Sequence, residues 1–146
     1  MEEIDFHKKM AVDLFNAAWS LIDKKDRTKE ETDTMIHCAH ASRYHWGVIG
    51  KPVNFERGEQ QISKMYSLIG RGESALFHAK RCLEICLEIG IGDWDLAFAY
   101  EAVARAYKTL GDESIMNEYI QKAKEAGEKI AEKDDKDYFF SEISTL

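Results

Sequence analysis

The densest group of residues that could do chemistry is the histidine-rich segment 37–46. Within it, His37, His40 and Tyr44 are spaced by three and four residues, so they lie on one side of a helix. Two histidines with Asp33 or a more distant glutamate could bind Zn²⁺ or another transition metal. A His-x-x-His pair is a weak signal, however, because neutral histidines often form hydrogen bonds between helices. We therefore expect no bound metal and treat the three side chains as a secondary candidate for the edge of a binding site.

A second line of potential ligands is formed by His78, Cys82 and Cys86, at intervals of four residues. Buried cysteines usually behave as small apolar residues, and we favour that interpretation of both thiols. Cys38 makes the number of cysteines odd, so a structural disulfide framework is not expected. Reduced thiols are typical of the cytoplasm, which is the expected location.

Motifs of the large enzyme classes are not found. The chain has no G-x-S-x-G, H-E-x-x-H, G-x-G-x-x-G or G-x-x-x-x-G-K-[ST] motif, and the glycines of segment 47–51 lack the rest of a phosphate loop. Acid–base groups at Glu56, Arg57 and Glu59 could act with the histidines only if the fold brings them together. The sequence therefore favours a protein without catalytic residues or cofactor.

The charges are distributed unevenly over the 146 residues. The net charge is −7, yet residues 37–81 carry seven Lys or Arg against three acidic residues. An acidic surface disfavours nucleic-acid binding, whereas the positive central segment could receive a carboxylate or a phosphate. No stretch has the ~20 apolar residues of a membrane span, and the acidic N-terminus does not resemble a signal peptide.

The periodicity of apolar residues predicts an all-α protein. Apolar stripes at helical spacing predict long helices over about 5–25, 28–48, 53–69, 73–89, 94–110 and 112–130, and a short last helix at about 137–146. Thr28 and Glu31 form a capping box, Pro52 suits a first helical turn, and Asp93 is expected to be an N-cap. Residues 131–137 are expected to be a charged break between helices. We thus expect one domain of three helix pairs (5–48, 53–89 and 93–130) with a capping helix.

The chain also repeats itself. Tyr66 and Gly70 recur as Tyr107 and Gly111, 41 residues later. Helices of this length joined by short glycine-containing turns, repeated at 30–50 residues, are typical of an α-solenoid.

The repeat resembles the tetratricopeptide repeat (TPR) family. The matching positions are Tyr100, Val103, Ala104, Tyr107, Gly111 and Ala123 in one repeat, and Ile62, Ser63, Tyr66, Gly70 and Ala75 in the other, where Cys82 replaces the last small residue. The chain departs from the family in its period of 41 instead of 34 residues and in lacking the proline that ends each repeat. Residues 6–48 align only loosely.

The resemblance implies a concave face lined by the first helix of each pair, where such proteins bind their ligands. Its positions would be occupied by Arg57, Gln60, Lys64, Phe98, Glu101 and Arg105. Three of these are cations, and guanidinium groups suit carboxylates. The family's carboxylate-clamp members use lysine and asparagine at several of these positions, however, where this chain has arginine, glutamine and Glu101. The alternative is a solvated helix face with ion pairs such as that between Glu101 and Arg105.

The expected function is therefore a protein- or peptide-binding helical repeat module that recognises an acidic or carboxylate-bearing segment. The identity of the partner cannot be predicted from the sequence. Two alternatives stay open. One is a small-molecule-binding or metal-dependent enzyme centred on the His37, His40 and Tyr44 segment; the other is a self-associating regulatory module that forms a homodimer.

Overall fold

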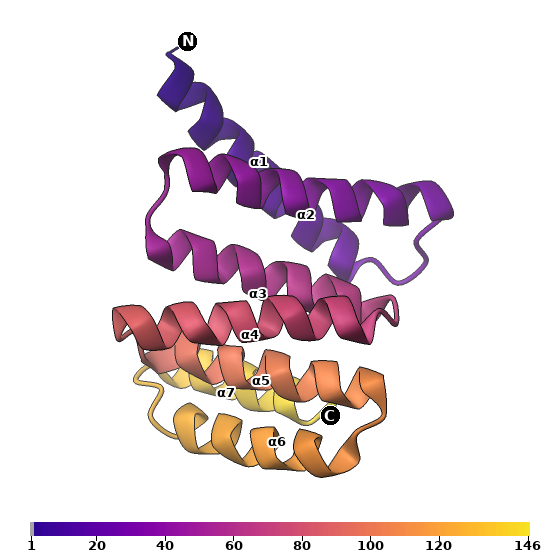
Figure 1. The fold of residues 1–146 in the computed structure, drawn as a ribbon, viewed down its shortest axis with the longest axis vertical. Coiled ribbons are helices and arrows are strands. Elements are labelled where there is room, and N and C mark those ends of the chain that lie inside the picture. The colour runs from indigo at the N-terminus through magenta and orange to yellow at the C-terminus, as the bar shows by residue number, and fades with distance from the viewer. Residues whose placement is uncertain (1) are drawn as a thin grey trace.

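The computed structural model describes residues 2–146, and in that range it contains only helices and no strand. The helices are α1 (Glu3–Asp23), α2 (Lys29–Ile49), α3 (Pro52–Leu68), α4 (Gly72–Ile89), α5 (Asp93–Leu110), α6 (Glu113–Gly127) and α7 (Lys133–Ile143). They stack one upon another in chain order, with α7 lying beside α5 and α6 (Figure 1).

The helices pack in the pattern of a helical repeat. The hairpins α1–α2, α3–α4 and α5–α6 make the most extensive contacts, and α2–α3 and α4–α5 contacts join them. In addition, α3 contacts both α1 and α5, so the first helices of the three hairpins form one layer. The expected all-α, solenoid-like fold is confirmed.

The 41-residue recurrence corresponds to one repeated helix end. Gly70 and Gly111 have φ values of +80° and +79°, a conformation that glycine adopts without a steric penalty. In each case the next amide donates back to the tyrosine carbonyl, from Arg71 to Tyr66 at 2.8 Å and from Asp112 to Tyr107 at 3.0 Å. This is the hydrogen bond of a Schellman motif, so both tyrosines sit in the last turns of their helices for the same reason.

The predicted helix starts are confirmed at α2 and α3. The Thr28 hydroxyl accepts from the Glu31 amide at 3.1 Å, and the Glu31 carboxylate accepts from the Thr28 amide at 3.0 Å, which completes the capping box. Pro52 is the first residue of α3.

The prediction that Asp93 is an N-cap is wrong. Gly92 occupies that position, and Asp93 is already in the helix with a φ of +52°. Its carboxylate does not cap α5 but accepts a hydrogen bond from the Ala131 amide at 2.9 Å. Asp93 thereby ties the loop between α6 and α7 to the start of α5.

The expected charged break at residues 131–137 is also wrong in part, because α7 begins at Lys133 and α6 already ends at Gly127. The charges do not interrupt the helix. Acidic side chains in the first turn suit the positive end of the helix dipole, and Lys133 pairs with Asp137 at 2.7 Å one turn later. Gly127 allows α7 to approach, since a Cβ there would lie 2.4 Å from the Phe139 ring.

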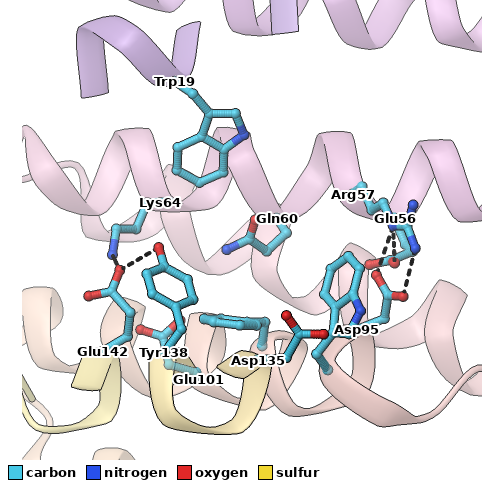
Figure 2. A pocket seen from close by; sticks show the side chains of 12 residues that line it. Trp19, Glu56, Arg57, Gln60, Lys64, Asp95, Glu101, Asp135, Tyr138 and Glu142 are labelled. Carbon is cyan, nitrogen blue, oxygen red and sulfur yellow. Dashed lines mark hydrogen bonds and ion pairs between the residues drawn. The ribbon is translucent and has the colours of Figure 1, made fainter. Parts of the chain in front are cut away.

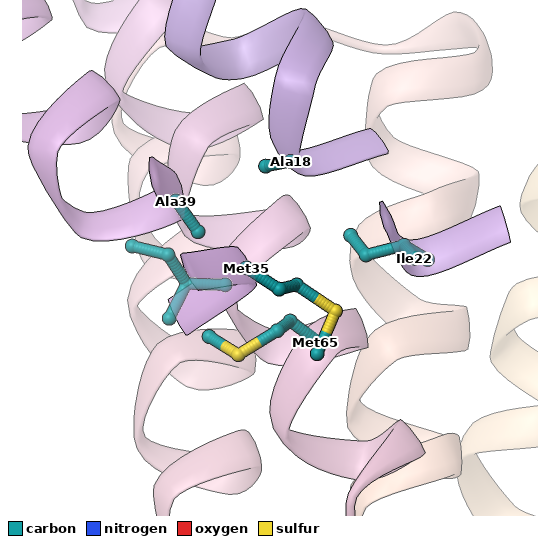
Figure 3. Close-up of a cluster of buried hydrophobic side chains, with 6 residues drawn as sticks. Ala18, Ile22, Met35, Ala39 and Met65 are labelled. Atoms are coloured by element: carbon teal, nitrogen blue, oxygen red, sulfur yellow. The ribbon is translucent and has the colours of Figure 1, made fainter. Parts of the chain in front are cut away.

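Two apolar clusters hold the ends of the stack together. At the N-terminal end, Ala18 and Ile22 of α1 meet Met35 and Ala39 of α2 and Met65 of α3 (Figure 3). At the C-terminal end, the fully buried Phe139 of α7 packs against residues of α5 and α6. Within residues 2–146, none of the helices has both the length and the apolar character that a membrane crossing requires.

Candidate functional site

A pocket of about 260 Å³ opens on the layer formed by the first helices of the hairpins (Figure 2). Three of its walls are α1, α3 and α5, and α7 closes the fourth side. The lining residues are Trp19, Glu56, Arg57, Gln60, Lys64, Trp94, Asp95, Phe98, Glu101, Asp135, Tyr138 and Glu142.

Helical spacing places these side chains on one face. The α3 residues recur at intervals of three or four, from Arg57 through Gln60 to Lys64, and the α5 residues do the same from Asp95 through Phe98 to Glu101. Because α3 and α5 pack against each other, their two lines face a common space.

An ion pair crosses the pocket from α3 to α5. Arg57 donates two hydrogen bonds to the two carboxylate oxygens of Asp95, each 3.0 Å long, and its guanidinium lies 4.5 Å from the centre of the Trp94 ring. Asp95 is only 5% exposed. A bidentate pair of this kind fixes both side chains and stabilises the contact between the two helices.

Two further cations connect the pocket to α7. Lys64 donates to Glu142 at 3.2 Å, and Tyr138 donates to the same carboxylate at 3.3 Å. Arg105 pairs with Glu101 at 2.6 Å and also donates to the Glu142 carbonyl at 3.1 Å. The cations of the pocket region are therefore already paired with carboxylates.

A buried carboxyl lies beside the first ion pair. Glu56 is 1% exposed, and its Oε2 accepts a hydrogen bond from the Cys82 thiol at 3.4 Å. Burial, together with the neighbouring Asp95, raises the pKa of Glu56 to about 10, so this carboxyl is neutral at pH 7. Besides Glu56, the lining has four acidic side chains, and three of them are paired with Arg57, Lys64 and Arg105.

The groove predicted from the sequence coincides in large part with this pocket. Five of its six residues line it, namely Arg57, Gln60, Lys64, Phe98 and Glu101. Arg105 is not a lining residue, because it lies behind Glu101 and holds the end of α7.

Sequence reasoning missed the rest of the lining. It did not identify Trp94 and Asp95, although they lie three or four residues before Phe98 and so on the same side of α5. The α7 wall, with Asp135, Tyr138 and Glu142, had no such signal, because nothing in the sequence says where a capping helix will dock.

The histidine-rich segment lies elsewhere. His37 and Tyr44 are exposed, and neither they nor His40 line the pocket. His40 Nε2 is 2.8 Å from the Tyr66 hydroxyl, and burial, with the nearby His78, lowers the pKa of His40. The contact between His40 and Tyr66 is a hydrogen bond between α2 and α3.

The line of His78, Cys82 and Cys86 is divided between two environments. His78 lies 3.2 Å from the Glu59 carboxylate, which also accepts a hydrogen bond from Arg43 at 3.2 Å. Both thiols are instead buried against Glu56. The candidate acid–base residues are therefore divided between two places. Glu59 contacts His78, whose ring lies 5.7 Å from that of His40, whereas Glu56 and Arg57 lie at the pocket.

Comparisons with known proteins found no matching family model, no similar curated protein and no similar solved structure. The function must therefore be inferred from the geometry of the pocket.

Proposed function

We propose that this chain is a TPR-like module that binds a protein or peptide segment in the pocket between α3, α5 and α7. One observation carries the proposal: the pocket opens on the layer of first helices, and residues from three hairpins and the last helix converge there. The repeated Tyr66–Gly70 and Tyr107–Gly111 helix ends support the TPR resemblance.

The pocket is suited to one side chain of the partner. Its volume of about 260 Å³ is just below the ~300–1,000 Å³ of sites for drug-sized ligands. Four aromatic side chains form its apolar surface, and carboxylates stand around them. The aromatic residues are Trp19, Trp94, Phe98 and Tyr138.

The charge of the lining favours a basic side chain, such as lysine or arginine, over the acidic segment expected from the sequence. An arriving carboxylate would have to displace Asp95 from Arg57 or Glu142 from Lys64. A cation instead finds Asp135, the one lining carboxylate other than Glu56 without a salt bridge among residues 2–146, and aromatic faces that attract positive charge. Recognition of an acidic segment stays a prediction, and it requires that these ion pairs open.

A panel of peptides tests whether the pocket prefers a basic or an acidic side chain. Matched peptides that differ at one central position, carrying Lys, Arg, Leu, Gln or Glu, are tested against the full chain by fluorescence anisotropy. We expect the Lys and Arg peptides to bind best and to weaken when Asp135→Asn and Glu142→Gln are combined. Glu84→Gln, at an exposed acid outside the pocket, is the control and should change nothing.

The contrary results are equally clear. Preferential binding of the Glu peptide, lost in Arg57→Met, would establish an acidic ligand. Binding that is indifferent to every pocket substitution would place the partner elsewhere. A wild-type protein that binds no peptide would remove the peptide-binding proposal.

A further inference from the structure

Three potential metal ligands meet below the pocket, between α3 and α4. Cys82 and Cys86 are one helical turn apart on α4, and both face Glu56 of α3. One ligand atom from each of the three lies within 4.8 Å of the others, and all three residues are buried. In residues 2–146 this is the sole group of three or more His, Cys, Asp or Glu with that proximity.

Ordinary core packing does not account for Glu56. Its side chain is 1% exposed, and its Oε1 has no hydrogen-bond partner. The nearest cation to that oxygen is the Arg57 Nε, at 3.9 Å, and this group is already engaged by Asp95. A buried carboxyl oxygen without a partner is destabilising, so it calls for a function or for a ligand.

The distance between one sulfur and one oxygen donor matches that in a tetrahedral site. With Zn–S near 2.3 Å and Zn–O near 2.0 Å, the oxygen and sulfur of such a site are about 3.5 Å apart. The observed distance from Cys82 Sγ to Glu56 Oε2 is 3.4 Å. Two thiolates favour a thiophilic ion over Mg²⁺ or Ca²⁺, which prefer oxygen ligands.

We infer that Glu56, Cys82 and Cys86 form a binding site for a thiophilic divalent ion of the Zn²⁺ type. On binding, each thiol and the carboxyl releases its proton to solvent. Three protein ligands leave one position for another donor, as in zinc sites that keep an open position. Because Glu56 also lines the pocket, that position lies near the pocket floor. The inference does not depend on the proposed peptide binding.

Cobalt supplies the test, because Co²⁺ takes the place of Zn²⁺ and its thiolate complexes absorb in the near ultraviolet. Co²⁺ is titrated into the reduced, untagged, metal-free full chain. We expect thiolate-to-cobalt absorption that saturates at one ion per chain and disappears when Zn²⁺ is added. The absorption should be lost in Cys82→Ser/Cys86→Ser and kept in Cys38→Ser, which removes the third thiol. Glu56→Gln should keep the thiolate band but bind Co²⁺ more weakly.

A wild-type chain without this absorption, or a band that survives in Cys82→Ser/Cys86→Ser, overturns the inference. If that double variant proves unfolded by circular dichroism, alkylation of the wild type decides. Zn²⁺ should then slow the modification of Cys82 and Cys86 and leave that of Cys38 unchanged. Equal modification rates with and without Zn²⁺ overturn the inference.

Discussion

Removing the cation of the ion pair between Arg57 and Asp95 should destabilise the protein much more than removing its anion. Arg57→Met keeps an unbranched side chain against Trp94 but leaves Asp95, 5% exposed, as an unpaired charge beside Glu56. Breaking a fully buried pair costs about 3–5 kcal/mol. Since the Arg57 side chain is 39% exposed, we expect about 2–3 kcal/mol after allowance for solvent screening.

Asp95→Asn should cost less, about 1 kcal/mol, because the guanidinium can turn to water and the amide still accepts one hydrogen bond. The substitution also removes a negative neighbour of Glu56. The double variant Arg57→Met/Asp95→Asn should therefore be more stable than Arg57→Met alone, since it no longer buries an unpaired carboxylate.

Urea unfolding followed by far-UV circular dichroism measures these free energies, and equal m-values confirm that only stability changed. In thermal melts, each kcal/mol of lost stability should lower the melting temperature by about 2–4 °C for a chain of this size. Arg81→Met, which breaks the exposed pair with Glu84, is the control and should stay within about 0.5 kcal/mol. If the double variant is less stable than Arg57→Met, the buried-charge reasoning is refuted.

Two other substitutions test how the helices pack. Gly127→Ala should lower the unfolding free energy by about 1–3 kcal/mol, because its Cβ would lie 2.4 Å from the Phe139 ring. Gly47→Ala, at an exposed position of α2, should instead raise it by about 0.5–1 kcal/mol; urea unfolding measures both. Burial, with His78 nearby, lowers the pKa of His40 below its ordinary 6.5, so the unfolded chain takes up this proton first and stability should fall as the pH drops below 6.5. In melts from pH 7.5 to 5.5, His40→Gln should flatten this decline; an unchanged slope, or an equal effect of the exposed His37→Gln, would contradict the assignment.

The helices were predictable from the sequence because their signals are local. Capping at Thr28, the start at Pro52 and the paired Tyr–Gly ends depend on residues fewer than six apart. The errors at Asp93 and Lys133 have a common cause. In both places the structure depends on the docking of α7, through the hydrogen bond from Ala131 to Asp93 and the close approach of α7 to α6. Sequence periodicity carries no information about such docking.

The site was predictable only in part for the same reason. A repeat fixes which face of α3 and α5 looks inward, so five of the six groove positions line the pocket. The repeat pattern does not determine which charged side chains form ion pairs with each other. Arg57 and Asp95 are 38 residues apart, and Lys64 and Glu142 are 78 apart, so these ion pairs, on which our proposal of a basic ligand depends, emerge only in three dimensions.

The buried polar side chains can be divided into those that helix packing explains and those that it does not. Among the described residues, the buried polar or charged ones are Ser42, Glu56, Glu59, Gln61, Ser63, Asp95 and Glu101, and all but Ser42 belong to α3 or α5. A solenoid core requires only apolar and small residues in these positions. Some of the six are explained by structure, since Ser63 donates to a carbonyl of the next helix at 2.8 Å. Glu56 is not explained in this way. Its Oε2 accepts a hydrogen bond from the Cys82 thiol, but its buried Oε1 has no partner, and an unsatisfied carboxyl oxygen among two thiols is where we place the further site.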